Sequence, residues 1–214
     1  MTGPESQGRA PLPPGLASCP VIAIVRRIPS HAVLPLARAL LASGLRVLEL
    51  TVDSPDALSM ISALRDQIPD LTVGAGTVLD AFTAHRAIGA GAKFLVSPHT
   101  DHELLDFAQS SGVPLIAGAA TASEAMAAWK GGAAAVKLFP ASVLGVLTLD
   151  ALREPFPHIC FIAVGGIDAT NASDFIEHGC AAVGVGSWLV ARGDPDAAAK
   201  RAALLVGTLR PAVP

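Results

Sequence analysis

Eight short apolar runs recur along the chain, roughly every two dozen residues, and stretches rich in Ala, Leu and polar residues separate them. The runs are almost continuously apolar, which is typical of parallel strands covered by helices, whereas half-exposed strands alternate apolar and polar residues. We expect strands at residues 20–25, 46–52, 71–78, 93–98, 114–120, 134–140, 160–166 and 181–187. The intervening segments, among them 30–42, 55–67, 122–130 and 170–178, have helical periodicity, and several begin with Ser, Thr or Asp and end at Gly.

Eight strand–helix units in about 200 residues predict an α/β fold, a compact single-domain (β/α)₈ TIM barrel. An open doubly wound sheet is the alternative. It fits less well because no Gly-rich dinucleotide loop follows the first run and no change in composition divides the chain into halves. We assign residues 15–214 to the barrel. Residues 1–14, rich in Pro, Gly and polar residues, are expected to form a flexible tail without the apolar core of a secretion signal or membrane span.

The composition narrows the possible partners and the compartment. With 51% hydrophobic and 15% charged residues, a chain of 214 residues can bury one core. The net charge is −3 and Lys and Arg form no run, so neither nucleic acid nor an anionic membrane is an expected partner. Cys19, Cys160 and Cys180 form no CxxC pair, as in a reduced cytoplasmic protein, and no spacing of His and carboxylate residues is typical of a metal site.

In such barrels the chemistry lies at the carboxyl ends of the strands, and this chain has few polar residues there. They are Arg26, Glu49 and Thr51, Thr77, Ser97 and His99 on either side of Pro98, and Lys137. His99 and Pro98 are candidates for lining a pocket. The other histidines fall in helices or loops, where we expect them to be solvated.

Lys137 lies in the middle of a short apolar run, Gly132-Ala-Ala-Ala-Val-Lys137-Leu-Phe-Pro140. Burial disfavours the charged ammonium and lowers its pKa, so the free amine becomes a nucleophile for a carbonyl group near neutral pH. This environment favours a Schiff base. The alternative is a lysine at a strand end whose stem covers apolar surface while its ammonium group reaches water.

Strand periodicity places Glu49 and Lys137 on faces that can both point into the barrel, from two even-numbered strands that contribute to the same interior layer. The amine could then attack a ketone while the carboxyl group transfers protons during dehydration and C–C cleavage. The alternative is a buried ion pair that only closes the barrel. Such pairs contribute little net stability after desolvation, so they are weakly motivated as structure.

Paired small residues lie at the ends of the last two expected strands: Gly165 with Gly166, and Gly186 with Ser187. Their backbone amides could cradle a phosphate group, because the loops after the seventh and eighth strands are the usual phosphate site in this fold. Glycine also serves tight packing of a helix on a strand, which is the alternative reading.

These residues together resemble the class I aldolases of 2-keto-3-deoxy-6-phosphogluconate and 4-hydroxy-2-oxoglutarate, from about Pro20 to Leu209. The segment Gly132-x-x-x-Val-Lys-Leu-Phe-Pro-Ala-x-x-x-Gly145 matches the Schiff-base signature of that family, which implies that Lys137 forms the imine. Gly44-Leu-x-x-x-Glu49-Leu-Thr51 matches the second signature and implies Glu49 as the acid/base residue. Thr77, after Gly76, also fits the family pattern and is implied near the pyruvate moiety.

The resemblance breaks after Thr51, where the family commonly has an arginine for the substrate carboxylate and this chain reads Val52-Asp53-Ser54-Pro55. An aspartate cannot bind an anion as an arginine does. A branch that resembles the 6-phosphogalactonate aldolases also lacks that arginine and has one at the end of the first strand, which implies Arg26 as the carboxylate ligand. The same branch has Ala-Val-Gly-Gly where this chain has Val164 before Gly165, which implies a different stereochemical demand from the threonine of the gluconate enzymes.

The resemblance implies reversible cleavage of a 2-keto-3-deoxy-6-phospho sugar acid to pyruvate and glyceraldehyde 3-phosphate, with no metal or other cofactor, by a homotrimer. The sequence leaves the sugar epimer open. The unphosphorylated 4-hydroxy-2-oxoglutarate is an alternative substrate. Alternatives of another class are a barrel that binds a phosphate ligand without C–C chemistry, or a thiamine phosphate synthase, which would need an acidic cluster for magnesium that we do not find in the sequence.

Overall fold

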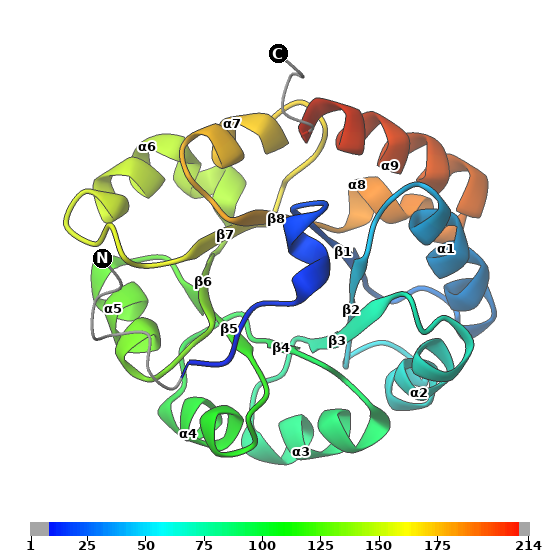
Figure 1. Ribbon diagram of the computed structural model, residues 1–214, viewed down its shortest axis with the longest axis horizontal. Coiled ribbons are helices and arrows are strands. Elements are labelled where there is room, and N and C mark those ends of the chain that lie inside the picture. Colours follow the sequence, from blue (N-terminus) through cyan, green and yellow to red (C-terminus); the bar gives the residue numbers. More distant parts are fainter. Residues whose placement is uncertain (1–8, 210–214) are drawn as a thin grey trace.

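The computed structural model describes residues 9–209, and eight parallel strands in it close into a barrel in chain order (Figure 1). The strands are β1 (Val21–Val25), β2 (Val47–Thr51), β3 (Thr72–Gly76), β4 (Leu95–Val96), β5 (Leu115–Ala119), β6 (Ala135–Leu138), β7 (Phe161–Val164) and β8 (Ala182–Val185). Helices surround the barrel on the outside, as Figure 1 shows. The predicted (β/α)₈ barrel is therefore confirmed.

The outer ring follows from the helical periodicity of the linking segments. It consists of α1 (Ser30–Ala42), α2 (Ala57–Gln67), α3 (Ala81–Ala90), α4 (His102–Ser110), α5 (Ala122–Lys130), α6 (Ala141–Arg153), α7 (Ala172–Glu177), α8 (Ser187–Val190) and α9 (Pro195–Leu209), with the short 3₁₀ helix η3 (Ala191–Gly193) after α8. Side chains of Asp80, Asp101 and Thr121 cap the amino ends of α3, α4 and α5, since each accepts a backbone N–H of the first turn.

The barrel interior forms a core of its own, separate from the core between strands and helices. Val47 and Ala135 belong to the interior core, so Glu49 and Lys137, two residues further along the same strands, also face inward. Lys137 lies level with Gly118 of β5. The predicted shared interior face of Glu49 and Lys137 is thus confirmed.

The amino-terminal segment packs across the amino end of the barrel. The 3₁₀ helix η2 (Pro14–Ala17), drawn in blue over the ring of strands in Figure 1, buries Leu16 in the interior core, and Leu12 packs against the same core. The guanidinium of Arg9 lies 3.6 Å from the centre of the Trp129 ring and donates to the Trp129 carbonyl oxygen at 3.0 Å. Residues 9–14 of the expected tail therefore contact the barrel, while residues 1–8 lie outside the described part.

The fourth expected strand, residues 93–98, is shorter in the structure. β4 spans only two residues, although strand-like hydrogen bonds extend further, from Lys93 N–H to Val73 O at 2.8 Å and from Ser97 N–H to Ile116 O at 3.0 Å.

Among residues 9–209, no helix is long and apolar enough to cross a membrane.

Candidate active site

A cavity of about 590 Å³ opens at the carboxyl ends of the strands, inside the ring. It is lined by ten of the residues that the sequence predicted for the site, namely Arg26, Glu49, Thr77, Pro98, Lys137, Val164, Gly165, Gly166, Gly186 and Ser187. These residues lie on or directly after seven different strands, so only closure of the barrel brings them together. His99, which was also a candidate for lining the pocket, does not line this cavity, and its Nδ1 lies 3.0 Å from the hydroxyl of buried Ser97.

Lys137 lies near the end of β6 and is 6% exposed. Burial lowers the pKa of its ammonium group; the nearby carboxyl of Glu49 opposes this shift and the guanidinium of Arg26 adds to it. Its Nζ lies 4.8 Å from the centre of the Phe139 ring. The amine is therefore held at the base of the cavity in an environment that favours its neutral, nucleophilic form.

Glu49 lies on β2 and is 2% exposed. Burial raises the pKa of its carboxyl group, against the attraction of Lys137 and Arg26. The two shifts have opposite directions, so both groups move toward their neutral forms. A neutral acid beside a neutral amine can donate a proton while the amine attacks a carbonyl.

Three glycines, on β3, β5 and β8, leave space for groups that line the cavity. A Cβ on Gly76 would lie 1.7 Å from Oε1 of Glu49, and one on Gly118 would lie 2.1 Å from the Pro98 carbonyl oxygen. A Cβ on Gly184 would lie 2.8 Å from Cγ2 of Val164. These roles of the three glycines were not predicted from the sequence, although glycine inside an expected strand is a sign that another group approaches closely.

The rim of the cavity carries two arginines that share one carboxylate. Nη2 of Arg26 lies 2.9 Å from Oδ2 of Asp53, and Nη2 of Arg27 lies 3.1 Å from the same oxygen. Burial tends to raise the pKa of Asp53, but hydrogen bonds from Thr51 and Arg26 and the charges of both arginines lower it. Arg27 also lines the cavity, although it was not predicted from the sequence.

The loop after β7 has a backbone conformation that requires glycine. Gly165 and Gly166 have φ values of 98° and 72°, a region that disfavours residues with a Cβ. A Cβ on Gly166 would also lie 2.1 Å from the Ser142 hydroxyl oxygen. Gly186 is the N-cap of α8, which begins at Ser187.

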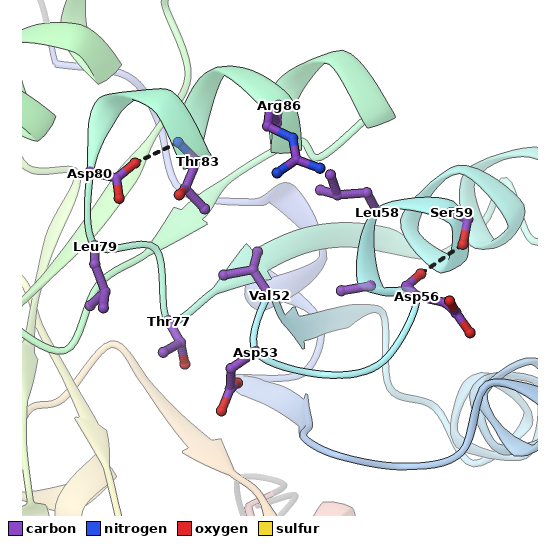
Figure 2. Close-up of a pocket in the computed structure, with 11 residues that line it drawn as sticks. Val52, Asp53, Asp56, Leu58, Ser59, Thr77, Leu79, Asp80, Thr83 and Arg86 are labelled. Carbon is purple, nitrogen blue, oxygen red and sulfur yellow. Dashed lines mark hydrogen bonds between the residues drawn. The ribbon is translucent and has the colours of Figure 1, made fainter.

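Figure 2 shows a second pocket, of about 520 Å³, on the outer side of the same rim between the β2–α2 and β3–α3 loops. It shares Thr77 with the cavity, and Thr77 has a left-handed φ of 57°, which is strained for a β-branched residue. Asp80, on its wall, accepts the Thr83 N–H at 2.6 Å. Glu49 and Lys137 do not line this pocket, so we place the chemistry in the barrel cavity.

Among residues 9–209, no group of three or more His, Cys, Asp or Glu side chains could hold a metal ion.

Comparison with known proteins places the chain in a family. The model of the KDPG and KHG aldolases matches residues 15–201. A 2-dehydro-3-deoxy-phosphogluconate aldolase of Pseudomonas aeruginosa is 42% identical over 178 residues, which cover 83% of this chain and 80% of that protein.

Solved structures agree with this match. A native KDPGal structure superposes with a TM-score of 0.85 at 33% identity, covering 88% of this chain and 93% of that one. A KDPG aldolase from Legionella pneumophila, with pyruvate captured as a covalent carbinolamine, has a TM-score of 0.79 at 36% identity and covers 91% of this chain and 94% of that one. The chain therefore belongs to the KDPG and KHG aldolase family.

Proposed function

We propose that this protein cleaves a 2-keto-3-deoxy-6-phospho sugar acid to pyruvate and glyceraldehyde 3-phosphate through an imine on Lys137. The observation that carries the proposal is the buried pair of Lys137 and Glu49, which line one cavity and whose pKa values shift toward neutral forms. The covalent carbinolamine of pyruvate in the Legionella enzyme supports the same chemistry.

The proposed reaction begins with attack of the neutral Lys137 amine on the C2 ketone of the substrate. Glu49 gives its proton to the carbinolamine hydroxyl, which leaves as water and produces the iminium. The Glu49 carboxylate then takes the proton of the C4 hydroxyl. The C3–C4 bond breaks, its electron pair forms an enamine that neutralises the iminium nitrogen, and the aldehyde leaves. Protonation of the enamine at C3 and hydrolysis of the imine release pyruvate and free Lys137.

The carboxylate of the substrate is assigned to Arg26, whose charge acts on both Lys137 and Glu49 and thus lies close to the reacting atoms. A guanidinium offers the planar donors that a carboxylate accepts. Thr77 and Pro98 line the same cavity and are assigned to the pyruvate moiety.

The phosphate group is assigned to the backbone of the loops that contain Gly165 and Gly166, and Gly186 and Ser187. Val164, directly before this cradle, is assigned to the neighbourhood of C4. It offers no hydrogen bond to a hydroxyl group there, so we infer that it influences the choice of epimer. The cavity volume of about 590 Å³ is within the usual range for small-molecule sites.

Trapping with pyruvate and borohydride tests the proposal. We expect a reduced pyruvyl adduct on Lys137, located by mass spectrometry of peptides, because reduction converts an imine into a stable secondary amine. The variant Lys137→Met should form no adduct, and the control Lys93→Met should form it as the wild type does. An adduct on a different lysine, or none, would refute the imine. Turnover of the two 6-phospho epimers and of 4-hydroxy-2-oxoglutarate then identifies the substrate.

We also propose that the protein is a cytoplasmic homotrimer whose catalytic domain spans residues 15–214. Its described surface exposes several large apolar side chains, namely Leu79, Phe82, Val143 and Leu147, which supports an interface between copies. The thiols of Cys160 and Cys180 are free, which is compatible with a reducing compartment. Analytical ultracentrifugation measures the number of subunits, and a monomer would contradict this part of the proposal.

A further inference from the structure

Arg27 has an unusual backbone conformation at the rim of the cavity. Its φ is 53°, in the left-handed region, where a side chain costs conformational free energy that glycine avoids. Its N–H donates to the Ser54 hydroxyl at 2.8 Å, and that hydroxyl lies 2.9 Å from the Thr51 hydroxyl, so the conformation is fixed by the neighbouring loop. The backbone therefore does not require an arginine here, and the role of the residue lies in its side chain.

The side chains of Arg26 and Arg27 converge on one oxygen atom. Oδ2 of Asp53 accepts from Nη2 of both, at 2.9 and 3.1 Å. The Asp53 side chain is 25% exposed, against 52% for Arg26 and 70% for Arg27. We refer to Arg26, Arg27 and Asp53 as the trio. The Asp53 carboxylate is its least exposed member and binds the two longer, more exposed arginine side chains.

The charge of this trio decides what Arg26 can offer to a substrate. Arg26 paired with Asp53 alone would be neutral, and a substrate carboxylate would meet the opposing charge of Asp53 at close range. Arg27 contributes a second positive charge to the same oxygen, so the trio carries a net charge of +1. A net charge of +1 is opposite and equal to the charge of one substrate carboxylate. The trio also lies near the reacting groups, because the charge of Arg26 acts on both Lys137 and Glu49.

We propose that Arg27 is a positioning residue that shares the carboxylate of Asp53 and thereby leaves the charge of Arg26 available to the substrate carboxylate. This inference rests on the proposed function, in which Arg26 binds that carboxylate. Arg27 then needs no contact with the substrate. If the positive charge of Arg27 is removed, substrate binding should weaken, and removal of the negative charge of Asp53 should restore it.

A double-mutant cycle tests this coupling with three variants, Arg27→Gly, Asp53→Asn and the two combined. Glycine suits the left-handed φ, and asparagine keeps the shape of aspartate without its charge. In Arg27→Gly we expect KM and the pyruvate Kd to rise about three- to tenfold at low ionic strength with kcat unchanged, because the effect is electrostatic and partly screened by solvent. The effect should shrink at high salt. Asp53→Asn should leave KM unchanged or lower it, and the double variant should return to the wild-type KM.

Arg192→Gly is the matched control, since Arg192 is an exposed arginine with a φ of 59° that does not line the cavity. It should leave KM unchanged. Thermal unfolding verifies that each variant is folded, and Arg27→Asn replaces Arg27→Gly if the glycine variant is not, because Asn also tolerates a left-handed φ.

Three results would overturn the inference: an unchanged KM in Arg27→Gly, a raised KM in Asp53→Asn, or a double variant as impaired as Arg27→Gly. The last would mean that Arg27 contacts the substrate itself. Each result is distinct from failure of the proposed function, in which the wild-type protein would form no pyruvyl adduct on Lys137.

Discussion

Replacing Gly76 with alanine tests how exactly the barrel positions Glu49. Gly76 ends β3, and a Cβ there would lie 1.7, 2.4 and 2.5 Å from Oε1, Cδ and Cγ of Glu49. Its φ is outside the left-handed region, so the backbone accepts alanine and only the new methyl group matters. The variant therefore perturbs Glu49 without altering any functional group.

The size of the effect follows from these distances. Real Cβ contacts are essentially never below 3.0 Å, so the Glu49 oxygen must retreat by at least 1.3 Å. A misplacement of about 1 Å in a reacting group costs about 10²-fold in rate, so we expect kcat to fall by about that factor. Overpacking costs about 1–3 kcal/mol, and reduced freedom of the unfolded chain returns about 0.4–1 kcal/mol. The free energy of unfolding should fall by about 0.5–2 kcal/mol.

Pyruvate release, coupled to NADH oxidation by lactate dehydrogenase, measures kcat, and urea denaturation measures the free energy of unfolding. Gly89→Ala in α3 is the control, because nothing lies within 4 Å of the added Cβ. It should raise the free energy of unfolding by up to about 1 kcal/mol and leave kcat unchanged. If Gly76→Ala keeps kcat within about twofold of wild type, Glu49 either tolerates this displacement or does not transfer the proton, and the reasoning fails.

Four further predictions concern the same cavity. Glu49→Gln should lower kcat about 10²- to 10⁴-fold with little change in KM, measured by the same coupled assay; near-wild-type activity would assign the proton transfer to another group. Arg26→Lys keeps the charge but loses the planar fork, so the pyruvate Kd measured by calorimetry should rise about tenfold or more, and an unchanged Kd would place the anion elsewhere. Val164→Thr adds a hydroxyl near C4 and should move the ratio of kcat/KM values toward the gluconate epimer, whereas an unmoved ratio would remove Val164 as its determinant. The rate of borohydride trapping should rise with pH and reach half its maximum well below 10.5, the ordinary pKa of lysine, because burial lowers the pKa of Lys137 and only the neutral amine attacks; a midpoint near 10.5 would contradict this.

The fold could be predicted because buried parallel strands are continuous apolar runs, and eight such runs stand out from the segments between them. Their ends could not be predicted as well. The run 93–98 includes Pro98, yet β4 covers only Leu95–Val96, because an apolar run shows that a segment is buried and not where its pairing with neighbours stops.

The site could be predicted in part because the fold itself brings strand ends together. Glu49 and Lys137 are far apart in sequence, and strand periodicity with even strand numbers was enough to place them in one cavity. The contacts at the rim of the cavity could not be predicted from the sequence. The convergence of Arg26 and Arg27 on Asp53 depends on the left-handed φ of Arg27 and on the conformation of two loops, and neither leaves a periodic pattern.

The cavity depends on three glycines, which have no side chain to fill it. Gly76, Gly118 and Gly184 lie on β3, β5 and β8, and each stands against a group from the strand before it, Glu49 on β2, Pro98 after β4 or Val164 on β7. A Cβ at any of these three glycines would lie within 3 Å of that group. An eight-stranded barrel is normally filled by its own side chains, so a reaction cavity requires that some strands contribute none. Gly118 illustrates this, because it lies level with Lys137 in the register of β5 and β6, and the Pro98 carbonyl group occupies the place that its Cβ would take.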